Sequence, residues 1–171
     1  MFSCADDVLP KPKGMLRLDY PTANYNFTTS DCPFGFDLNT LGNVAYKPNC
    51  AAEIEYSLMD GTVYLTYRQV NDNIEKLLSD AQKITYEHVV KADNILEEMY
   101  VNEQQRVYGM FYDVSGNAAS QSQFYVTDSV NHFITGSIYF RTKPNYDSIL
   151  PAAAYLKKDI KQLMETIRWD N

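Results

Sequence analysis

Apolar and polar side chains alternate along seven short stretches of this chain, the pattern of half-buried β-strands. In MLRLDYP, for example, Leu16, Leu18 and Tyr20 fall on one face and Pro21 ends the run. Several of the other stretches are rich in β-branched and aromatic residues, which favour extended backbone. The pattern therefore predicts strands over residues 15–21, 34–38, 52–57, 60–68, 106–114, 122–128 and 132–141.

The spacing of apolar residues becomes helical in the middle of the chain. From Asn71 or Asp72, either of which suits a helix N-cap, apolar residues recur every three or four positions as far as Met99. This predicts one middle helix of about seven turns, with a break allowed near residues 91–94. His88 falls on the apolar stripe, where a histidine is more often part of a packed core than a ligand.

A second helix is predicted at the C-terminal end. Asp147 or Ser148 is placed to cap it, and Pro151 falls in its first turn, where proline is tolerated. Strands joined as hairpins with helices between them indicate an α+β domain over residues 15–171. We expect a mainly antiparallel sheet of about six to seven strands covered by both helices. The apolar residues of the last helix are Ile149, Ala153, Leu156, Ile160, Leu163, Met164 and Ile167.

Length, charge and hydropathy narrow the classes of function. A chain of 171 residues is long enough for one domain with a sizeable core. Its net charge of −7 repels a phosphate backbone, and the basic cluster at residues 11–13 is too short to offset this, which argues against nucleic acid as a partner. No apolar run reaches 18 residues, so the sequence predicts no membrane-spanning helix.

The first residues resemble the end of a bacterial lipoprotein signal. In MFSC, the small Ser3 directly precedes Cys4, as in a lipobox, where the cysteine after the cleavage site receives fatty acids such as palmitate. The following ADDVLPKPKG is polar, charged and Pro-rich, and such a spacer extends to roughly 30 Å. This predicts a lipobox remnant and flexible tether over residues 1–14, with lipid on Cys4. The alternative is a disordered tail with an incidental thiol.

Two cysteines remain, Cys32 and Cys50, and they are either a disulfide or two buried free thiols. In an oxidising compartment a disulfide would close a loop of about 19 residues, which stabilises a fold by about 3 kcal/mol. Neither cysteine belongs to a CxxC pair or a histidine cluster, so the sequence predicts no metal site.

The stretch QFYVTDSVNHFITGSIYF places Asp128, Ser129 and His132, the residue types of a hydrolase triad, around one turn. Strand alternation, however, puts His132 on the same face as Ile134, in the core or at its margin. The chain has no GxSxG motif, and triads are assembled from distant segments. We therefore expect no catalytic residues and no cofactor. The alternatives are a periplasmic hydrolase using Ser129 or Ser137 with His132, and a domain that binds a small ligand or ion.

The same turn has two non-catalytic interpretations. In the first, Thr127, Asp128 and Ser129 lock a hairpin by bonding to nearby backbone, and Gly136 permits close packing. In the second, six polar residues share one rim and form a surface for a protein partner. These residues are Thr127, Asp128, Ser129, Asn131, Asn145 and Asp147.

Longer motifs in the second half of the chain resemble a known family. GNAAS, QFYVTDS, HF, GSIYF and PNYDS follow one another within residues 116–148. With VYGMFYDV before them and ILPAAAYLKKDIKQ after, they resemble the GldD family of gliding motility lipoproteins of Bacteroidetes. The first half agrees, because PKPKGMLRLDYP follows Cys4 and CPFGFD is followed by Cys50.

The resemblance implies a non-enzymatic lipoprotein of the cell envelope that is required for gliding and for the linked type IX secretion system. It would be anchored by lipid on Cys4, with its domain in the periplasm, and would act through contacts with other gliding and secretion proteins. The order of elements is also similar to PsbP-like domains, which act mainly as protein-binding modules, although that likeness concerns the fold alone. Two tripeptides, at residues 128–130 and 147–149, resemble the short O-glycosylation signal of Bacteroidetes envelope proteins.

Overall fold

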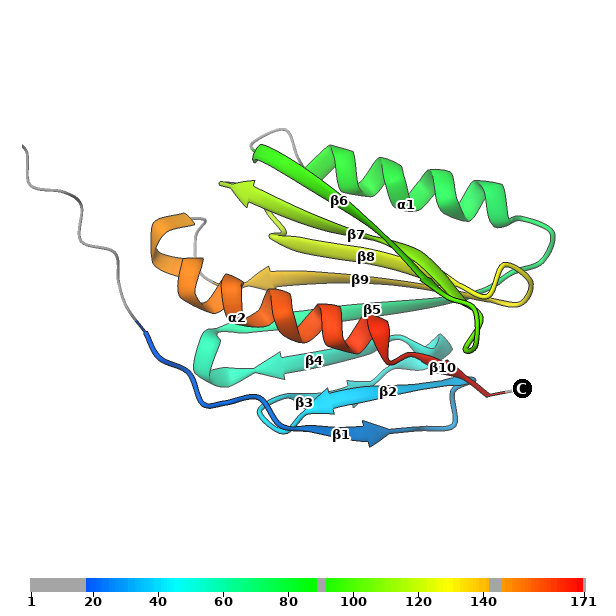
Figure 1. The fold of residues 1–171 in the computed structure, drawn as a ribbon, viewed down its shortest axis with the longest axis horizontal. Helices are drawn as coiled ribbons and strands as arrows, with labels where there is room; N and C mark the ends of the chain where they lie inside the picture. The colour runs from blue at the N-terminus through cyan, green and yellow to red at the C-terminus, as the bar shows by residue number, and fades with distance from the viewer. Residues whose placement is uncertain (1–17, 89–91, 142–145, 171) are drawn as a thin grey trace, which may run out of the picture.

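A computed structural model describes residues 18–88, 92–141 and 146–170. Its main feature is a seven-stranded antiparallel sheet with the order β3-β4-β5-β9-β8-β7-β6 (Figure 1). The strands of this sheet are β3 (Asn43–Tyr46), β4 (Ala52–Tyr56), β5 (Gly61–Gln69), β6 (Ala92–Asn102), β7 (Val107–Gly116), β8 (Ser122–Thr127) and β9 (His132–Phe140).

A second, three-stranded sheet has the order β1-β2-β10, and the described residues also form two α-helices. Sheets and helices together make an α+β structure, which confirms the predicted class; the likeness to PsbP-like domains stays a prediction. The remaining elements are β1 (Tyr25–Thr28), β2 (Phe34–Asn39), β10 (Arg168–Trp169), α1 (Ile74–His88), α2 (Tyr146–Glu165) and the short 3-10 turns η1 (Pro48–Cys50) and η2 (Ser57–Met59).

The two helices cover opposite faces of the main sheet. Successive residues of β9 point to opposite faces. Ile134 and Ile138 are buried in the larger core cluster with Leu156 of α2, whereas Phe133 packs with Ala81 of α1 in a smaller cluster. In Figure 1, α2 crosses the front of the sheet. The main sheet is therefore buried on both sides where β8 and β9 run.

The three-stranded sheet shares its core with the main sheet. Phe34 and Phe36 of β2 are buried in the larger cluster, and the Phe34 ring stacks on Tyr67 of β5 with centroids 5.7 Å apart. Packed aromatic pairs of this kind contribute about 1 kcal/mol beyond their buried area. The small sheet and α2 thus cover the same face of the main sheet.

A buried polar network fastens α2 to the small sheet. The Asp159 carboxylate of α2 accepts hydrogen bonds from the Tyr25 hydroxyl of β1 at 2.6 Å and from the Asn39 amide of β2 at 2.9 Å. Burial, and then the bond to Asp159, raise the pKa of the Tyr25 hydroxyl. The hydroxyl therefore remains a donor at neutral pH, and α2 is held in place by directional bonds as well as by apolar packing.

The prediction of one helix from residue 71 to 99 is wrong in its second half. The helix starts at Ile74 and ends at His88, whose side chain lies outside the described part, and β6 follows from Ala92. Leu96 and Met99, which fit a helical stripe, are both exposed on β6. Pairing with β7 satisfies the backbone there, so tertiary context overrides the local spacing.

The N-terminal strand was also misplaced. Residues 18–21 are not in a strand, residues 15–17 lie outside the described part, and the first strand is β1. The other six predicted strands are present, with boundaries within a few residues. The short strands β3 and β10 were missed, because four and two residues are too few to show an alternating pattern.

The helix starts differ slightly from the prediction. Asp147 and Ser148 lie inside α2 rather than capping it, and Pro151 is its sixth residue, beyond the first turn. For α1, Asn71 and Asp72 precede the start, and the Asn71 N–H donates to the side chain of Asn73 at 2.9 Å. The existence and packing of both helices agree with the sequence.

Candidate functional site

The turn between β8 and β9, which carries the predicted triad residues, is held by a dense set of hydrogen bonds. The Asp128 Oδ1 atom accepts bonds from the backbone N–H groups of Val130 at 3.0 Å and of Asn131 and His132 at 2.8 Å each. The Thr127 hydroxyl donates to the His132 carbonyl at 2.6 Å and accepts from the Ser129 N–H at 2.9 Å. These bonds lock the hairpin and hold Ser129 at a left-handed φ of 69°.

The Asp128 carboxyl is charged at neutral pH although it is only 5% exposed. Burial by itself would raise its pKa, but the N–H groups of His132, Asn131 and Val130 outweigh burial and lower the pKa below its ordinary value. The Arg106 guanidinium lies 3.9 Å from Oδ2 and adds a weaker attraction. The backbone of the turn therefore provides most of the stabilisation of this charge.

The His132 ring lies between two aromatic side chains at the end of the sheet. Its Nδ1 is 2.9 Å from the Tyr67 hydroxyl, and the ring stacks on Trp169 with centroids 5.1 Å apart. The Trp169 indole N–H in turn donates to the Arg106 carbonyl at 3.0 Å. Burial lowers the pKa of His132 and Arg106 adds to this, against the opposing effect of Asp128. The imidazole is therefore neutral at pH 7 and half-buried at the core margin, as the strand alternation predicts.

The geometry does not assemble a hydrolase triad. In a triad the carboxylate accepts a bond from the histidine ring, whereas Asp128 Oδ1 accepts one from the backbone of His132, and the ring nitrogen Nδ1 is bonded to Tyr67. Ser137 is an odd-numbered residue of β9 and points to the opposite face of the sheet from His132. The pair of Ser137 with His132 that the hydrolase alternative allows is therefore not formed.

The six residues of the predicted partner surface do not lie together. Ser129 and Asn131 are exposed at the turn, while Thr127 and Asp128 beside them are buried. Asp147 belongs to the start of α2, which follows the far end of β9, about 30 Å from the turn for a strand of nine residues (Figure 1). Asn145 lies outside the described residues. Of the six, the residues that can share a contact surface at this end of the sheet are those of the turn.

The structure contains the Cys32–Cys50 disulfide, with the two Cα atoms 5.5 Å apart. Cys32 precedes β2 of the small sheet, and Cys50 ends the η1 turn between β3 and β4 of the main sheet. Asn49 and Cys50 both adopt left-handed backbone, with φ of 60° and 57°. The bridge thus connects the two sheets at a tight turn. Cys4, the predicted lipidation site, lies outside the described residues, as does the predicted tether.

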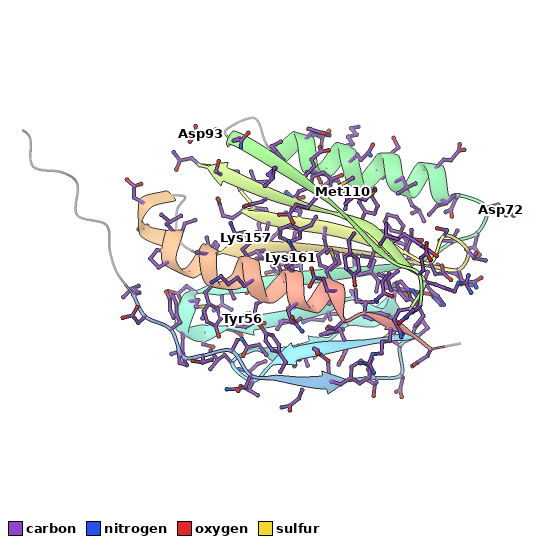
Figure 2. All side chains as sticks on the ribbon, viewed as in Figure 1. Tyr56, Asp72, Asp93, Met110, Lys157 and Lys161 are labelled. Atoms are coloured by element: carbon purple, nitrogen blue, oxygen red, sulfur yellow. A yellow bond between two sulfur atoms is a disulfide. The ribbon has the colours of Figure 1, made fainter. Side chains whose placement is uncertain are left out.

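Several ion pairs and contacts join segments that are distant in the sequence. Lys157 and Lys161 of α2 extend toward β7 and β6, where they pair with Asp113, at 2.9 Å, and with Glu98 (Figure 2). Sequence reasoning did not find these pairs, nor the contact of Trp169 with the turn. The single tryptophan was a signal of a packed aromatic, but no local pattern indicates which residue it contacts.

Two small cavities of about 40 Å³ each flank β8, one under α2 and one under α1. Three buried side-chain atoms around them lack a hydrogen-bond partner in the described part of the chain: Gln121 Oε1, Ser122 Oγ and Gln123 Nε2. Cavities of this size and polarity suit an ordered water. They are too small for an organic ligand of ordinary size.

Within residues 18–88, 92–141 and 146–170, no three histidine, cysteine or acidic side chains are grouped to hold a metal ion. Neither helix of this described portion is long and apolar enough to cross a membrane.

Comparison with known families agrees with the motifs in the second half of the chain. A family model described as gliding motility lipoprotein GldD matches residues 5–169, nearly the whole sequence. No curated protein matches the chain. The matched region begins directly after Cys4 and includes both sheets, both helices and the β8–β9 turn. The chain belongs to the GldD family of gliding motility lipoproteins.

Proposed function

We propose that this chain is a non-enzymatic accessory lipoprotein, anchored in a membrane of the cell envelope by lipid on Cys4, that supports gliding and the linked type IX secretion system through protein contacts. The observation that carries the proposal is the family match over nearly the whole chain. The position of Cys4 one residue before the matched region fits a lipobox remnant and flexible tether over residues 1–14, with lipid on Cys4, followed by a folded periplasmic domain.

The geometry of the β8–β9 turn supports a role without catalysis. The groups that would form a catalytic site are used to build the turn, because Asp128 bonds to backbone and the His132 ring bonds to Tyr67. Ser129 and Asn131 remain exposed at the turn, where they can meet another protein. Modification of Ser129 by O-glycosylation stays a prediction at the same position.

The lipid anchor is tested by Cys4→Ala in the full-length protein expressed in a gliding bacterium. We expect the variant to move from the membrane fraction to the soluble fraction, because a lipid chain contributes about 0.8 kcal/mol for each buried CH₂ group. Gliding and secretion of type IX substrates should decrease when the protein leaves the membrane fraction. The measurements are fractionation, mass of the N-terminal peptide, and the rate of spreading on agar.

Two controls make the result specific. Cys4→Ala must retain its unfolding midpoint, since Cys4 lies in the proposed tether, and His132→Ala must leave gliding intact at equal protein level. Loss of gliding only in the histidine variant, with Cys4→Ala still in the membrane, would contradict the proposal and favour a chemical role.

A further inference from the structure

The β6 strand forms an outer edge of the main sheet and differs from the other edges. β3, at the opposite edge, has four residues and is followed by Lys47 and Pro48, and the outer strands of the small sheet have four and two residues. β6 has eleven residues and contains neither lysine nor proline. Short length, lysine and proline are three of the means by which proteins keep sheet edges from pairing with other chains. β6 has none of these three; its charged residues are all acidic, and its irregularity is confined to its first residues.

The edge is regular over most of its length. Residues Asn94 to Asn102 pair one for one with β7, and the register shift is confined to the segment before Asn94. These nine paired residues present an edge of about 30 Å. No strand in the described residues pairs with the outer side of β6. The outward N–H and C=O groups of β6 can form a regular ladder of hydrogen bonds with another extended strand, whereas a helix bonds its own backbone groups internally.

Apolar side chains stand on both faces of this edge. Met99 is 78% exposed and Val101 is 53% exposed, and both point to the face that α1 partly covers. Leu96 is 53% exposed on the opposite face. Met99 and Val101 lie opposite the half-buried Met110 and Tyr108 of β7, and Figure 2 labels Met110 on this part of the sheet. A strand added to β6 would place its own side chains against these apolar neighbours.

The acidic charge of the β6 edge favours a different protein, rather than a second copy of this chain, as its partner. The edge and its turn carry the acidic residues Asp93, Glu97, Glu98 and Glu103, with no basic residue before Arg106, and of these Glu98 already pairs with Lys161 of α2. Antiparallel pairing of β6 with its own copy would bring two acidic segments side by side, which is unfavourable. An incoming strand with lysine or arginine among its apolar residues would meet complementary charge.

We propose that β6 is a docking edge that accepts an extended, apolar and basic segment of a partner protein as an eighth strand of the main sheet. The proposal deepens the function proposed above, on which it rests, by assigning the protein contact to a particular surface. The partner segment gains backbone hydrogen bonds along the edge, and the exposed side chains of Met99, Val101 and Leu96 favour apolar side chains in it.

The spacing of photo-crosslinks tests the proposal in living cells. A photo-crosslinking amino acid replaces Leu96, Met99 or Val101, one at a time, in the full-length lipoprotein of a gliding strain, and the linked peptides are sequenced by mass spectrometry. We expect the probes at 99 and 101 to reach one segment of one partner at positions two residues apart. The probe at 96 should reach the same segment three residues from the position reached from 99, because paired strands advance together.

A matched pair of variants shows whether the edge controls the contact. Met99→Lys combined with Val101→Lys should lower the crosslink yield from position 96 by about tenfold, because lysine repels a basic segment and guards an edge. Leu58→Lys, at a residue that is 67% exposed on the η2 turn, should leave the yield unchanged. Both variants should keep the wild-type unfolding midpoint.

The outcomes separate this proposal from the proposed function. Crosslinks to a second copy of the chain, positions three or four residues apart reached from the probes at 99 and 101, as on a helix, or no common segment would each overturn the β6 proposal. A strain that lacks the whole protein but glides and secretes normally would overturn the accessory function instead. Normal gliding of the double-lysine strain, where the deletion strain does not glide, would overturn the β6 proposal alone.

Discussion

At the scale of single residues, Asp128 shows how a short turn stabilises a buried charge. Three consecutive backbone N–H groups point at one carboxylate oxygen, an arrangement that this tight turn provides. Hydrogen bonds to a charged group contribute about 1.5–3 kcal/mol each, more than bonds between neutral groups. The charge of Asp128 and the conformation of the turn therefore depend on one another.

The lowered pKa values of Asp128 and His132 predict a loss of stability in acid. The unfolded chain binds a proton at His132 near pH 6.5, above the pKa of the folded state, so the free energy of unfolding should fall as the pH drops below about 6.5. Asp128 adds a second loss below about pH 4, because its folded pKa is also depressed. Denaturant unfolding at a series of pH values measures both effects.

The variant His132→Asn isolates the first effect. Its stability should change less than that of the wild type between pH 6.5 and pH 5, while the loss below pH 4 remains. Equal slopes for the two proteins across the upper window would contradict the assignment to His132. The comparison also removes any contribution of His88, which is present in both proteins.

At the scale of elements, the long β6–β7 hairpin is the part of the fold that local spacing misrepresents. Ile95, Leu96 and Met99 have the separations of a helical stripe, and glutamates 97 and 98 are good helix formers. Pairing of nine residues with β7 outweighs these small preferences, which amount to tenths of a kcal/mol per residue. An element that is mostly exposed leaves no clear apolar face from which to recognise it.

The Cys32–Cys50 disulfide links two elements, because it joins the start of β2 to the turn before β4. Replacing both cysteines, Cys32→Ser with Cys50→Ser, should lower the free energy of unfolding by about 3 kcal/mol, the loop-closure value for a loop of this length. Chemical denaturation under oxidising conditions gives the measurement. Cys4→Ser is the matched control and should leave the midpoint unchanged; an equal loss there would contradict the assignment to the bridge.

At the scale of the whole molecule, α2 holds two sheets together. Its apolar side enters the common core through Leu156, Ile160 and Met164, and Asp159 bonds to β1 and β2 of the small sheet. On another side, Lys157 and Lys161 pair with the β6–β7 hairpin. One helix therefore contacts the small sheet, the centre of the main sheet and its far edge.

Asp159→Ala should lower the free energy of unfolding by about 3 kcal/mol, since it removes the carboxylate acceptor of the half-buried Tyr25 hydroxyl and leaves the buried Asn39 amide with the Tyr155 hydroxyl alone. Thermal or denaturant unfolding provides the measurement. Lys158→Ala, at the exposed neighbouring position, is the control and should change stability by no more than about 0.5 kcal/mol. Similar losses in the two variants would show that the network does not hold α2 in place.

Much of this structure could be predicted from residue patterns alone. Six strands, the last helix and the core position of Ile134 and Ile138 follow from periodicity. The close packing expected at Gly136 is present, because a Cβ atom there would lie 2.1 Å from the Phe124 ring. Gly136 faces Phe124 across β8 and β9, and the alternation that places them is a local property.

The sequence by itself determined which segments are strands or helices where one face is buried, that Cys32 and Cys50 are available to pair, and the family to which the chain belongs. Only the tertiary structure decided that residues 92–102 are an edge strand, that His132 stacks on Trp169, and that Asp159 is buried beside Tyr25. The reason is physical: periodicity records which side of a segment is buried. Residues that contact the β6 edge strand, the His132 ring and the Asp159 carboxylate come from distant segments, and only the packing of the whole chain brings them together.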